Sequence, residues 1–408
     1  MSHTLNNMTV LTSDLFSKSR KLNCVDDAVK LLLSYDHFRT FGDVLRKFSP
    51  NPDLKSQLVK GLQQWFPEDN LGSIDKKVRN WLNGKTQTVS KRDAYILCLI
   101  LHLTLTQTDE FLQYATGESI HWRDPEDIVW CYSILHHQTP KQTKDLLERS
   151  LAVLESTNKK GPESTNSYTA EVYDSVQNVL YLEEDDLLVF LREEQHRLGT
   201  FHNTAYQLFS QYMGLLKRGY SELGMEALFD EMTKEEKKKA QNSADGDIGP
   251  HKAEPITVRD ILETYMYRKF VPVQTRGKAK ASELFSPIQR NIRQNWPDEF
   301  SLSKIESRKQ DVSRKTLILL FLATDGTDSD FDEFEEAETA DDVFLSLYTR
   351  LNAMLNACGF PQLDPRSPFD WIILFCISSG DLWECDIRLQ EILVKMYSTA
   401  SAPNENPV

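Results

Sequence analysis

Apolar residues recur along this 408-residue chain at the three- and four-residue spacing of an α-helix, and this periodicity limits the fold more than any other feature. One example is a stripe at positions i, i+4, i+7 and i+8, formed by Ile74, Val78, Trp81 and Leu82. The alternation typical of strands and the Asn-Gly turns that join them are nearly absent. The chain is therefore predicted to be all-α and multi-helical, with about two or three helical domains.

Polar, turn-rich segments divide the sequence into blocks. Residues 1–155 are predicted to form an N-terminal helical domain, and residues 168–233 a middle helical segment. Residues 234–255 contain no Phe, Tyr or Trp, which predicts a mobile linker. A C-terminal helical domain is expected over residues 256–397, and a disordered tail over residues 398–408.

Some helices of the later blocks can be placed from their end signals and apolar content. Thr257 has the side chain of an N-cap, which predicts a helix over residues 258–270. Residues 368–377 are apolar on nearly every face, so that helix is expected at the centre of the C-terminal core. A second apolar helix is predicted over residues 381–397.

The net charge of −14 argues against a general nucleic-acid coat and against a membrane-surface protein, although it allows a local basic face. No apolar run reaches the roughly 18 residues of a membrane span, and no basic-then-apolar signal opens the chain, so no membrane partner is expected. The six cysteines lack CxxC spacing and lie mostly in apolar stretches, which is typical of buried thiols in a reducing compartment. We therefore expect a cytoplasmic protein.

One segment combines helix-end signals, the apolar stripe and a basic face. Ser73 is predicted to cap a helix over residues 73–82, and Gly84 to take the left-handed conformation after it. Side chains of the types that contact phosphates and base edges would lie on the outside of this helix and just beyond it. These are Lys76, Lys77, Arg79, Asn80 and Lys85.

The surrounding charge favours the same interpretation. Residues 54–92 carry eight basic and three acidic side chains, although the whole chain is acidic. Ser90 is predicted to cap the next helix, whose apolar spacing continues to Leu105.

A known arrangement of residues runs through this segment. It is carried by Val78, Trp81, Gly84 and Lys85, followed by Ile100-Leu101-His102-Leu103. The segment resembles the second half of a Cro/CI-type, XRE-like helix-turn-helix over about residues 72–112, and the whole unit would span residues 53–112. The resemblance implies that the helix within residues 73–85 is a recognition helix that lies in the major groove of double-stranded DNA.

The sequence departs from that family just before the recognition helix. Glu68 stands where the family has a small residue, and Pro67 beside it would remove a helix hydrogen bond at a cost of about 3 kcal/mol. The preceding helix is therefore predicted to stop near Phe66, and the longer turn would re-aim the recognition helix.

Two other interpretations of this segment stay open: a polar face that is only solvated, and a face that binds a protein partner. Several aromatic residues of the first block are candidate core or interface anchors. They are Trp65, Phe66, Trp81, Trp122 and Trp130.

A second basic zone spans residues 268–315, with twelve basic and five acidic side chains around Trp296. Such a patch could bind phosphates and stack a base, whereas the alternative is a solvated helix face with one core tryptophan. The candidate residues are Arg290, Arg293, Lys304, Arg308, Lys309, Arg314 and Lys315.

Residues 325–342 form an acidic loop with ten Asp or Glu residues and no Lys or Arg. The loop fails as a calcium-binding EF-hand because Asp330 or Glu333 stands where the sharp turn needs glycine. It is interpreted as a solvated loop, or as a cover that competes with a polyanion for one of the basic faces.

The remaining motifs do not predict catalysis. Two Glu-x-x-His steps, Glu118 to His121 and Glu193 to His196, lack the further carboxylates of a di-iron site, so neither a metal nor a cofactor is expected. No catalytic motif is present, which argues against an enzyme. The sequence is interpreted as a non-enzymatic bacterial regulator or adaptor that acts through protein contacts. The alternatives are a DNA-binding transcriptional regulator that uses the helix of residues 73–85, and an enzyme whose composite site is not visible in the sequence.

Overall fold

The computed structural model describes residues 10–22, 24–34, 38–85, 89–157, 169–199, 201–231, 257–272, 285–324, 339–380 and 382–398. Within these ranges every regular element is a helix and no strand occurs, which confirms the all-α prediction. No helix among them is long and apolar enough to cross a membrane. The predicted linker of residues 234–255, most of the acidic loop and nearly all of the predicted tail lie outside the described residues.

The chain divides into two compact units. Unit 1 contains residues 1–202, 279–292 and 352–375, and unit 2 contains residues 203–278, 293–351 and 376–408. Each unit joins stretches that are distant in the sequence, a division that composition along the chain does not reveal.

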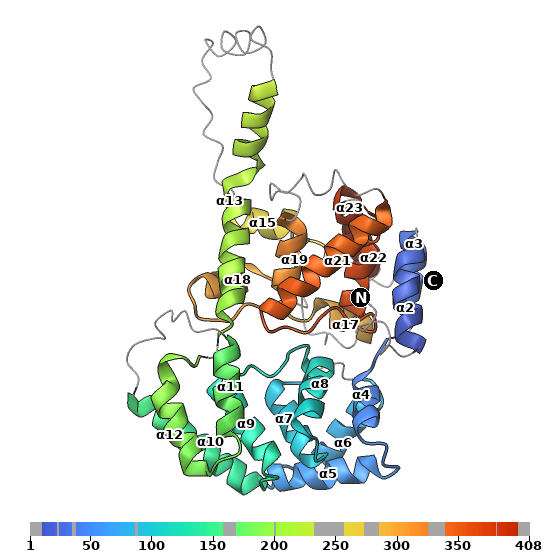
Figure 1. Cartoon of the computed structure of the whole chain (residues 1–408). Coiled ribbons are helices and arrows are strands. Elements are labelled where there is room, and N and C mark those ends of the chain that lie inside the picture. Colours follow the sequence, from blue (N-terminus) through green and yellow to red (C-terminus); the bar gives the residue numbers. More distant parts are fainter. Residues whose placement is uncertain are drawn as a thin grey trace. The chain divides into compact units, whose positions relative to one another are not determined.

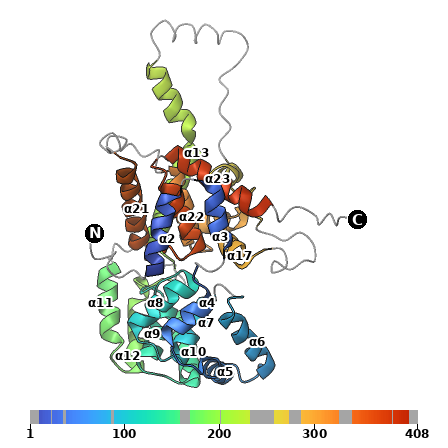
Figure 2. The same ribbon diagram turned by 90° about the vertical axis from the view of Figure 1, so that its right-hand side faces the viewer.

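Unit 1 consists mainly of short helices. They are α2 (Val10–Lys21), α3 (Val25–Leu33), α4 (Phe41–Phe48), α5 (Leu54–Trp65), α6 (Leu71–Leu82), α7 (Lys91–Ile100), α8 (Leu105–Thr116), α9 (Pro125–Leu135), α10 (Pro140–Thr157), α11 (Thr169–Val179), α12 (Glu184–Glu193) and the 3-10 helix η1 (Glu194–His196), with most of α17 (Pro287–Arg293) and of α22 (Pro368–Ile377). Figures 1 and 2 show α4 to α8 gathered in one bundle.

The core of unit 1 surrounds α7. All residues from Ala94 to Ile100 are buried, so this helix presents apolar side chains to neighbours on every side. The rings of Tyr95 and Trp130 stack with their centroids 5.5 Å apart, and Trp65 lies 5.7 Å from Trp130. These tryptophans are therefore core residues, not surface anchors.

Helix α6 begins earlier than the sequence analysis predicted. Its N-cap is Asn70, whose side chain accepts a hydrogen bond from the Gly72 N–H at 2.8 Å, whereas Ser73 already lies inside the helix. The end at Leu82 and the positive φ of Gly84 agree with the prediction. Helix α5 ends at Trp65, as the proline argument predicted.

The predicted single helix from Ser90 to Leu105 is wrong. Ser90 does cap α7, but α7 ends at Ile100, and His102 has a φ of +54°. Thr104 then caps α8 in a reciprocal capping box with Gln107. A Thr-x-x-Gln sequence is a start signal for a helix. The apolar spacing continues through Thr104, so it predicted one long helix where the structure has two.

Helix α22 has the predicted bounds, and all of its residues are buried. Its residues up to Phe375 belong to unit 1, where the Trp371 indole N–H donates to the Leu15 carbonyl of α2 at 3.0 Å. The ring of Trp371 also meets Phe38 edge to face at 6.2 Å. This helix therefore packs against the first helices of the chain.

Unit 2 consists of α13 (Asn203–Glu231), α15 (Val258–Thr264), α18 (Glu299–Glu306), α19 (Arg314–Thr324), most of α21 (Ala340–Ala357) and α23 (Leu382–Ser398). Thr257 caps α15 as predicted, but the helix ends at Thr264 and does not continue to residue 270. Tyr267 then takes a φ of +51°, and its hydroxyl donates to Asp386 of α23. The contact between Tyr267 and Asp386 stabilises a turn that the local sequence does not predict.

The contact between α4 and the end of α6 has no room for an added methyl group. A Cβ placed on Gly42 would lie 2.6 Å from the Leu82 carbonyl oxygen, a backbone atom that cannot move alone. Gly42→Ala is expected to lower the free energy of unfolding by about 1–3 kcal/mol, because the clash outweighs the better helix propensity of alanine. Urea denaturation measures this loss. Ser73→Ala, at an exposed position of α6, is the control, and equal stability of the two variants would contradict the close contact.

Candidate nucleic-acid interface

Helix α6 is held in unit 1 by the apolar stripe that the sequence predicted. Ile74, Val78 and Trp81 are 3%, 0% and 2% exposed. The Trp81 ring meets Phe41 of α4 edge to face at 5.7 Å, and Arg46 of α4 donates to the Leu82 carbonyl at 2.7 Å. One face of α6 is therefore fixed against the bundle, and the other face is left outside.

The predicted interface residues lie on this outer face or just after it. Lys76, Lys77, Arg79 and Lys85 are exposed, and Asn80 is half-buried. Because Lys76, Lys77 and Asn80 stand three, four and seven residues after exposed Ser73, these side chains share one side of the helix.

Ion pairs partly neutralise this face. Asp75 accepts from Arg79 at 2.8 Å and from Lys55 of α5 at 2.7 Å, and the hydrogen bond from Lys55 holds the pKa of Asp75 below its ordinary value. Lys77 pairs with Asp93 of α7 at 3.2 Å. Lys76, in contrast, has no ion-pair partner among the described residues.

The sequence patterns do not assign two further residues to this face. Lys55 joins the face through Asp75, which only the packing of α5 on α6 could reveal. Leu71 continues the apolar stripe at i−3 from Ile74, yet it is 58% exposed at the start of α6. Leu71 can be recognised as part of α6 only when the start of the helix is known, and the sequence predicts a later start at Ser73.

The second basic patch does not form one surface around its tryptophan. Trp296 is 3% exposed and donates to the Met266 carbonyl at 2.8 Å, so it is a core residue that cannot stack a base. Arg290 belongs to unit 1, whereas the other candidates belong to unit 2. Lys309 is exposed, and Arg314 is half-buried at the start of α19.

Several cations of this patch interact with other parts of unit 2. The Arg308 guanidinium lies 3.9 Å from the centre of the Tyr206 ring. The Lys304 ammonium lies 4.1 Å from the centre of the Phe300 ring, and Lys315 donates to the Gln294 carbonyl at 2.6 Å. Burial lowers the pKa of Arg293. These contacts are typical of structural roles.

A buried ionic cluster lies at the start of α7 and α9 in unit 1. The Lys91 ammonium contacts the Asp127 carboxylate at 2.6 Å, and the His121 backbone N–H donates to the same carboxylate at 2.7 Å. Burial raises the pKa of Asp124, the N-cap of α9, to about 7. Burial, followed by the charge of His202, lowers the pKa of His121 well below its ordinary value. No group of His, Cys, Asp and Glu in the described ranges is arranged to hold a metal ion.

The histidines of the two Glu-x-x-His steps have separate surroundings. The ring of His121 stacks on His202 at 4.0 Å, and Glu118 lies 3.7 Å from the Lys91 ammonium. Glu193 and His196 are exposed near the end of α12. The two steps therefore serve different local contacts.

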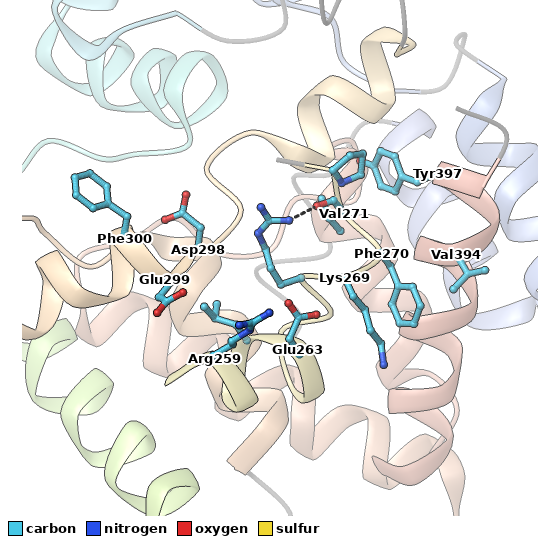
Figure 3. Close-up of a pocket in the computed structure, with 13 residues that line it drawn as sticks. Arg259, Glu263, Lys269, Phe270, Val271, Asp298, Glu299, Phe300, Val394 and Tyr397 are labelled. Carbon is cyan, nitrogen blue, oxygen red and sulfur yellow. Dashed lines mark hydrogen bonds between the residues drawn. The ribbon is translucent and has the colours of Figure 1, made fainter. Parts of the chain in front are cut away.

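Unit 2 contains a hollow of about 820 Å³ (Figure 3). Asp298, Glu299 and Phe300 stand at the start of α18, and Val394 and Tyr397 of α23 lie on the opposite side. Phe300 is 69% exposed, which is unusual for a phenylalanine, and Val394 is 37% exposed.

Charges of both signs border the same hollow. Arg259 and Glu263 project from α15, and Lys269 follows in the next turn (Figure 3). Arg268 donates to the Val271 carbonyl at 2.9 Å, and Asp298 caps α18. The hollow thus combines apolar surface with a balanced set of charges.

Comparison of the chain with protein-family models, with curated proteins and with solved structures found no match.

His121 is expected to make stability depend on pH. The native state keeps this imidazole neutral beside Lys91, Arg123, His202 and the Asp127 carboxylate, whereas the unfolded chain binds a proton below about pH 6.5. The free energy of unfolding contributed by His121 should therefore fall as the pH drops from 7 to 5, by at most about 1.4 kcal/mol per pH unit. Urea denaturation across this range compares wild type with His121→Gln.

The comparison isolates His121 from a second group of opposite sign. Asp124 stays protonated in the native state up to about pH 7, so it stabilises the fold as the pH falls, and it is present in both proteins. Exposed His196 provides the control His196→Gln, which should follow wild type. Identical pH slopes for wild type and His121→Gln would show that His121 is not held neutral.

Proposed function

We propose that this chain is a non-enzymatic regulator that binds double-stranded DNA through the outer face of α6. The observation that carries the proposal is the division of this helix into two faces. Ile74, Val78 and Trp81 are locked in the core, while exposed Lys76 and Lys77 stand beside Asn80 on the outside.

These side chains suit a major groove. Lysines bind phosphate oxygens, and an asparagine amide can pair with the edge of adenine. The exposed Leu71 at the start of α6 adds an apolar group of the kind that contacts thymine methyls. The start of a helix is also electropositive, which favours a nearby phosphate. The likeness of residues 72–112 to a Cro/CI-type unit supports the same proposal.

The turn before α6 is the feature that re-aims the helix. Residues 66–70 separate α5 from α6, and Pro67 lies within them. The Lys55–Asp75 ion pair and the packing of α5 on α6 set the angle between the two helices. DNA binding in this geometry requires that the first turns of α6, with Ser73 and Lys76, enter the groove.

Charge reversal on α6 tests DNA binding. Lys76→Glu combined with Lys77→Glu is expected to weaken binding to a pool of random double-stranded DNA at least tenfold, because two phosphate contacts become repulsive. Wild-type affinity should fall steeply between 50 and 200 mM salt, and the variant should show a salt slope shallower by about two. Fluorescence anisotropy measures both quantities.

The matched control is Lys141→Glu, at an exposed position near the start of α10 in the same unit. It removes the same kind of charge without touching α6, so its affinity should stay within about twofold of wild type. Absence of binding by wild type at low salt, or equal weakening by both changes, would overturn the proposal.

A second candidate function is an adaptor that binds a protein partner in the hollow of unit 2. The observation that favours it is Phe300, 69% exposed beside Val394 and bordered by Arg259 and Glu299. Aromatic anchors with a charged rim are typical of protein interfaces. A partner segment with one apolar anchor flanked by charges of both signs would match this hollow.

Site-specific photocrosslinking tests the adaptor function. A photoreactive phenylalanine analogue at position 300 is expected to give one discrete protein adduct in extracts of the source cell, and Arg259→Glu should reduce its yield severalfold. The same analogue at Tyr181, which is 68% exposed in unit 1, is the control. Identical adducts from both positions, or none from position 300, would contradict docking in this hollow.

A further inference from the structure

A separate cavity of about 690 Å³ lies within unit 1. Its walls come mainly from α4, from α8 with the loop that follows it, and from residues 356–366. Cavities of 300–1,000 Å³ are typical of small-molecule sites. Its lining combines apolar, aromatic and charged side chains, so the state of each charge decides what it can bind.

The carboxylates at this cavity are all engaged in other contacts. Asp43 accepts from the Thr40 backbone N–H at 2.9 Å in the cap of α4. Asp109 accepts from the Ile120 N–H at 2.8 Å, and Glu110 from Lys47 at 2.5 Å. The fourth, Asp364, accepts from the guanidinium of Arg39. Glu110 and Asp364 are thus paired with cations of the lining, whereas Asp43 and Asp109 accept hydrogen bonds from neutral donors.

One cation of the lining has no such partner. The Arg366 side chain makes no hydrogen bond or ion pair with the described residues, and its Nε is buried without a partner. Its backbone carbonyl accepts from the Arg39 N–H at 3.1 Å, so two arginines are adjacent at the wall. Burial, followed by the charge of Arg39, lowers the pKa of Arg366, and the nearby carboxylates of Asp364 and Asp43 act in the opposite direction. A buried donor without an acceptor is costly, and an acceptor oxygen of an added anion would offset that cost.

Aromatic surface lies beside these charges. The Tyr114 ring is 3.9 Å from the Arg39 guanidinium and 4.4 Å from the Lys47 ammonium. Trp122 and Phe360 also line the cavity. A flat ring has apolar and aromatic surface to pack against here.

We propose that this cavity binds a small organic anion, a molecule with a carboxylate or phosphate group attached to a planar ring. Arg366 takes the anionic group, and Trp122 and Phe360 contact the ring. The volume, the aromatic lining and the buried Nε of Arg366 without an acceptor support such a ligand.

The ligand would also act on α6, a consequence that rests on the proposed DNA binding. Helix α4 contributes Lys47 to the cavity, while Arg46 of the same helix holds the Leu82 carbonyl at the end of α6. Gly84 lies against Thr40, which is adjacent to Arg39. A ligand that shifts α4 would therefore shift the helix that is proposed to contact DNA.

Binding is tested on the full chain with defined probes at matched ionic strength. Adenosine 5′-monophosphate and 4-hydroxybenzoate are the anionic probes, and adenosine and phenol are their neutral counterparts. At least one anionic probe is expected to bind saturably by calorimetry and to raise the melting temperature, while its neutral counterpart binds at least tenfold more weakly. The probe that binds shows whether the anionic group is phosphate or carboxylate.

The decisive variant is Arg366→Gln, which should weaken the binding probe at least tenfold. This variant removes a half-buried side chain whose Nε has no acceptor, so it is expected to fold with stability close to that of wild type. Arg192→Gln, at an exposed position of α12 in the same unit, is the control and should bind as wild type does. Failure of both anionic probes to bind, or equal affinity in Arg366→Gln, would overturn the ligand site.

A second arm separates this proposal from the proposed function. Saturating probe is expected to change the DNA affinity of wild type at least threefold and to leave that of Arg366→Gln unchanged. If the probe binds while DNA does not, the DNA-binding proposal fails and the ligand site stands. If DNA binds and neither probe does, the ligand site fails and the DNA-binding proposal stands.

Discussion

Unit 1 depends on the burial of the last seven residues of α7. A helix whose residues from Ala94 to Ile100 are all hidden from solvent must be covered on every side, and α5, α8 and α9 all pack against it. The contact is tight at Gly61 of α5, where an added Cβ would lie 2.6 Å from the Ile100 side chain. Because interiors pack as densely as crystals, the surrounding helices have little freedom in their placement. Helix α6 is positioned indirectly, through α4 and α5, and so keeps one face outside.

Local signals explain why the helices could be anticipated. N-caps such as Ser90 and Thr257 and the proline after α5 act within a few residues, so the sequence alone predicts where these helices begin or end. The same logic explains one error, because the capping box of Thr104 was concealed by an apolar run that continued through it. The buried stripe of α6 was predictable for the same local reason, and with it the exposed positions of Lys76 and Lys77.

Contacts between distant segments could not be anticipated. The partner of Arg79 lies four residues away and could be expected, but Asp75 is shared with Lys55 from another helix. Trp296 lies among basic residues in the sequence, yet its indole reaches the carbonyl of Met266 inside unit 2. The cavity of unit 1 is the extreme case, because Arg39 and Arg366 are more than three hundred residues apart and meet through a backbone hydrogen bond. Periodicity and charge counts along the chain carry no information about such pairs.

The distribution of charge partners, more than the number of charges, separates the surfaces of this protein. Most charged side chains in the second basic patch and the buried cluster are occupied by ring, carbonyl or carboxylate contacts, as Arg308 and Lys91 illustrate. Lys76 and Arg366 differ, because neither side chain makes an ion pair with the described residues. For Lys76 in water the missing partner costs little, since solvent screens the charge. For Arg366, the missing acceptor of the buried Nε has a real energetic cost, so this residue is the stronger argument for a ligand. Helix α4 contacts both the cavity and α6, since Lys47 lines the cavity and Arg46 donates to the Leu82 carbonyl at the end of α6. A single rigid helix with contacts on both sides is the simplest physical means by which occupancy of the cavity can alter the outer face of α6.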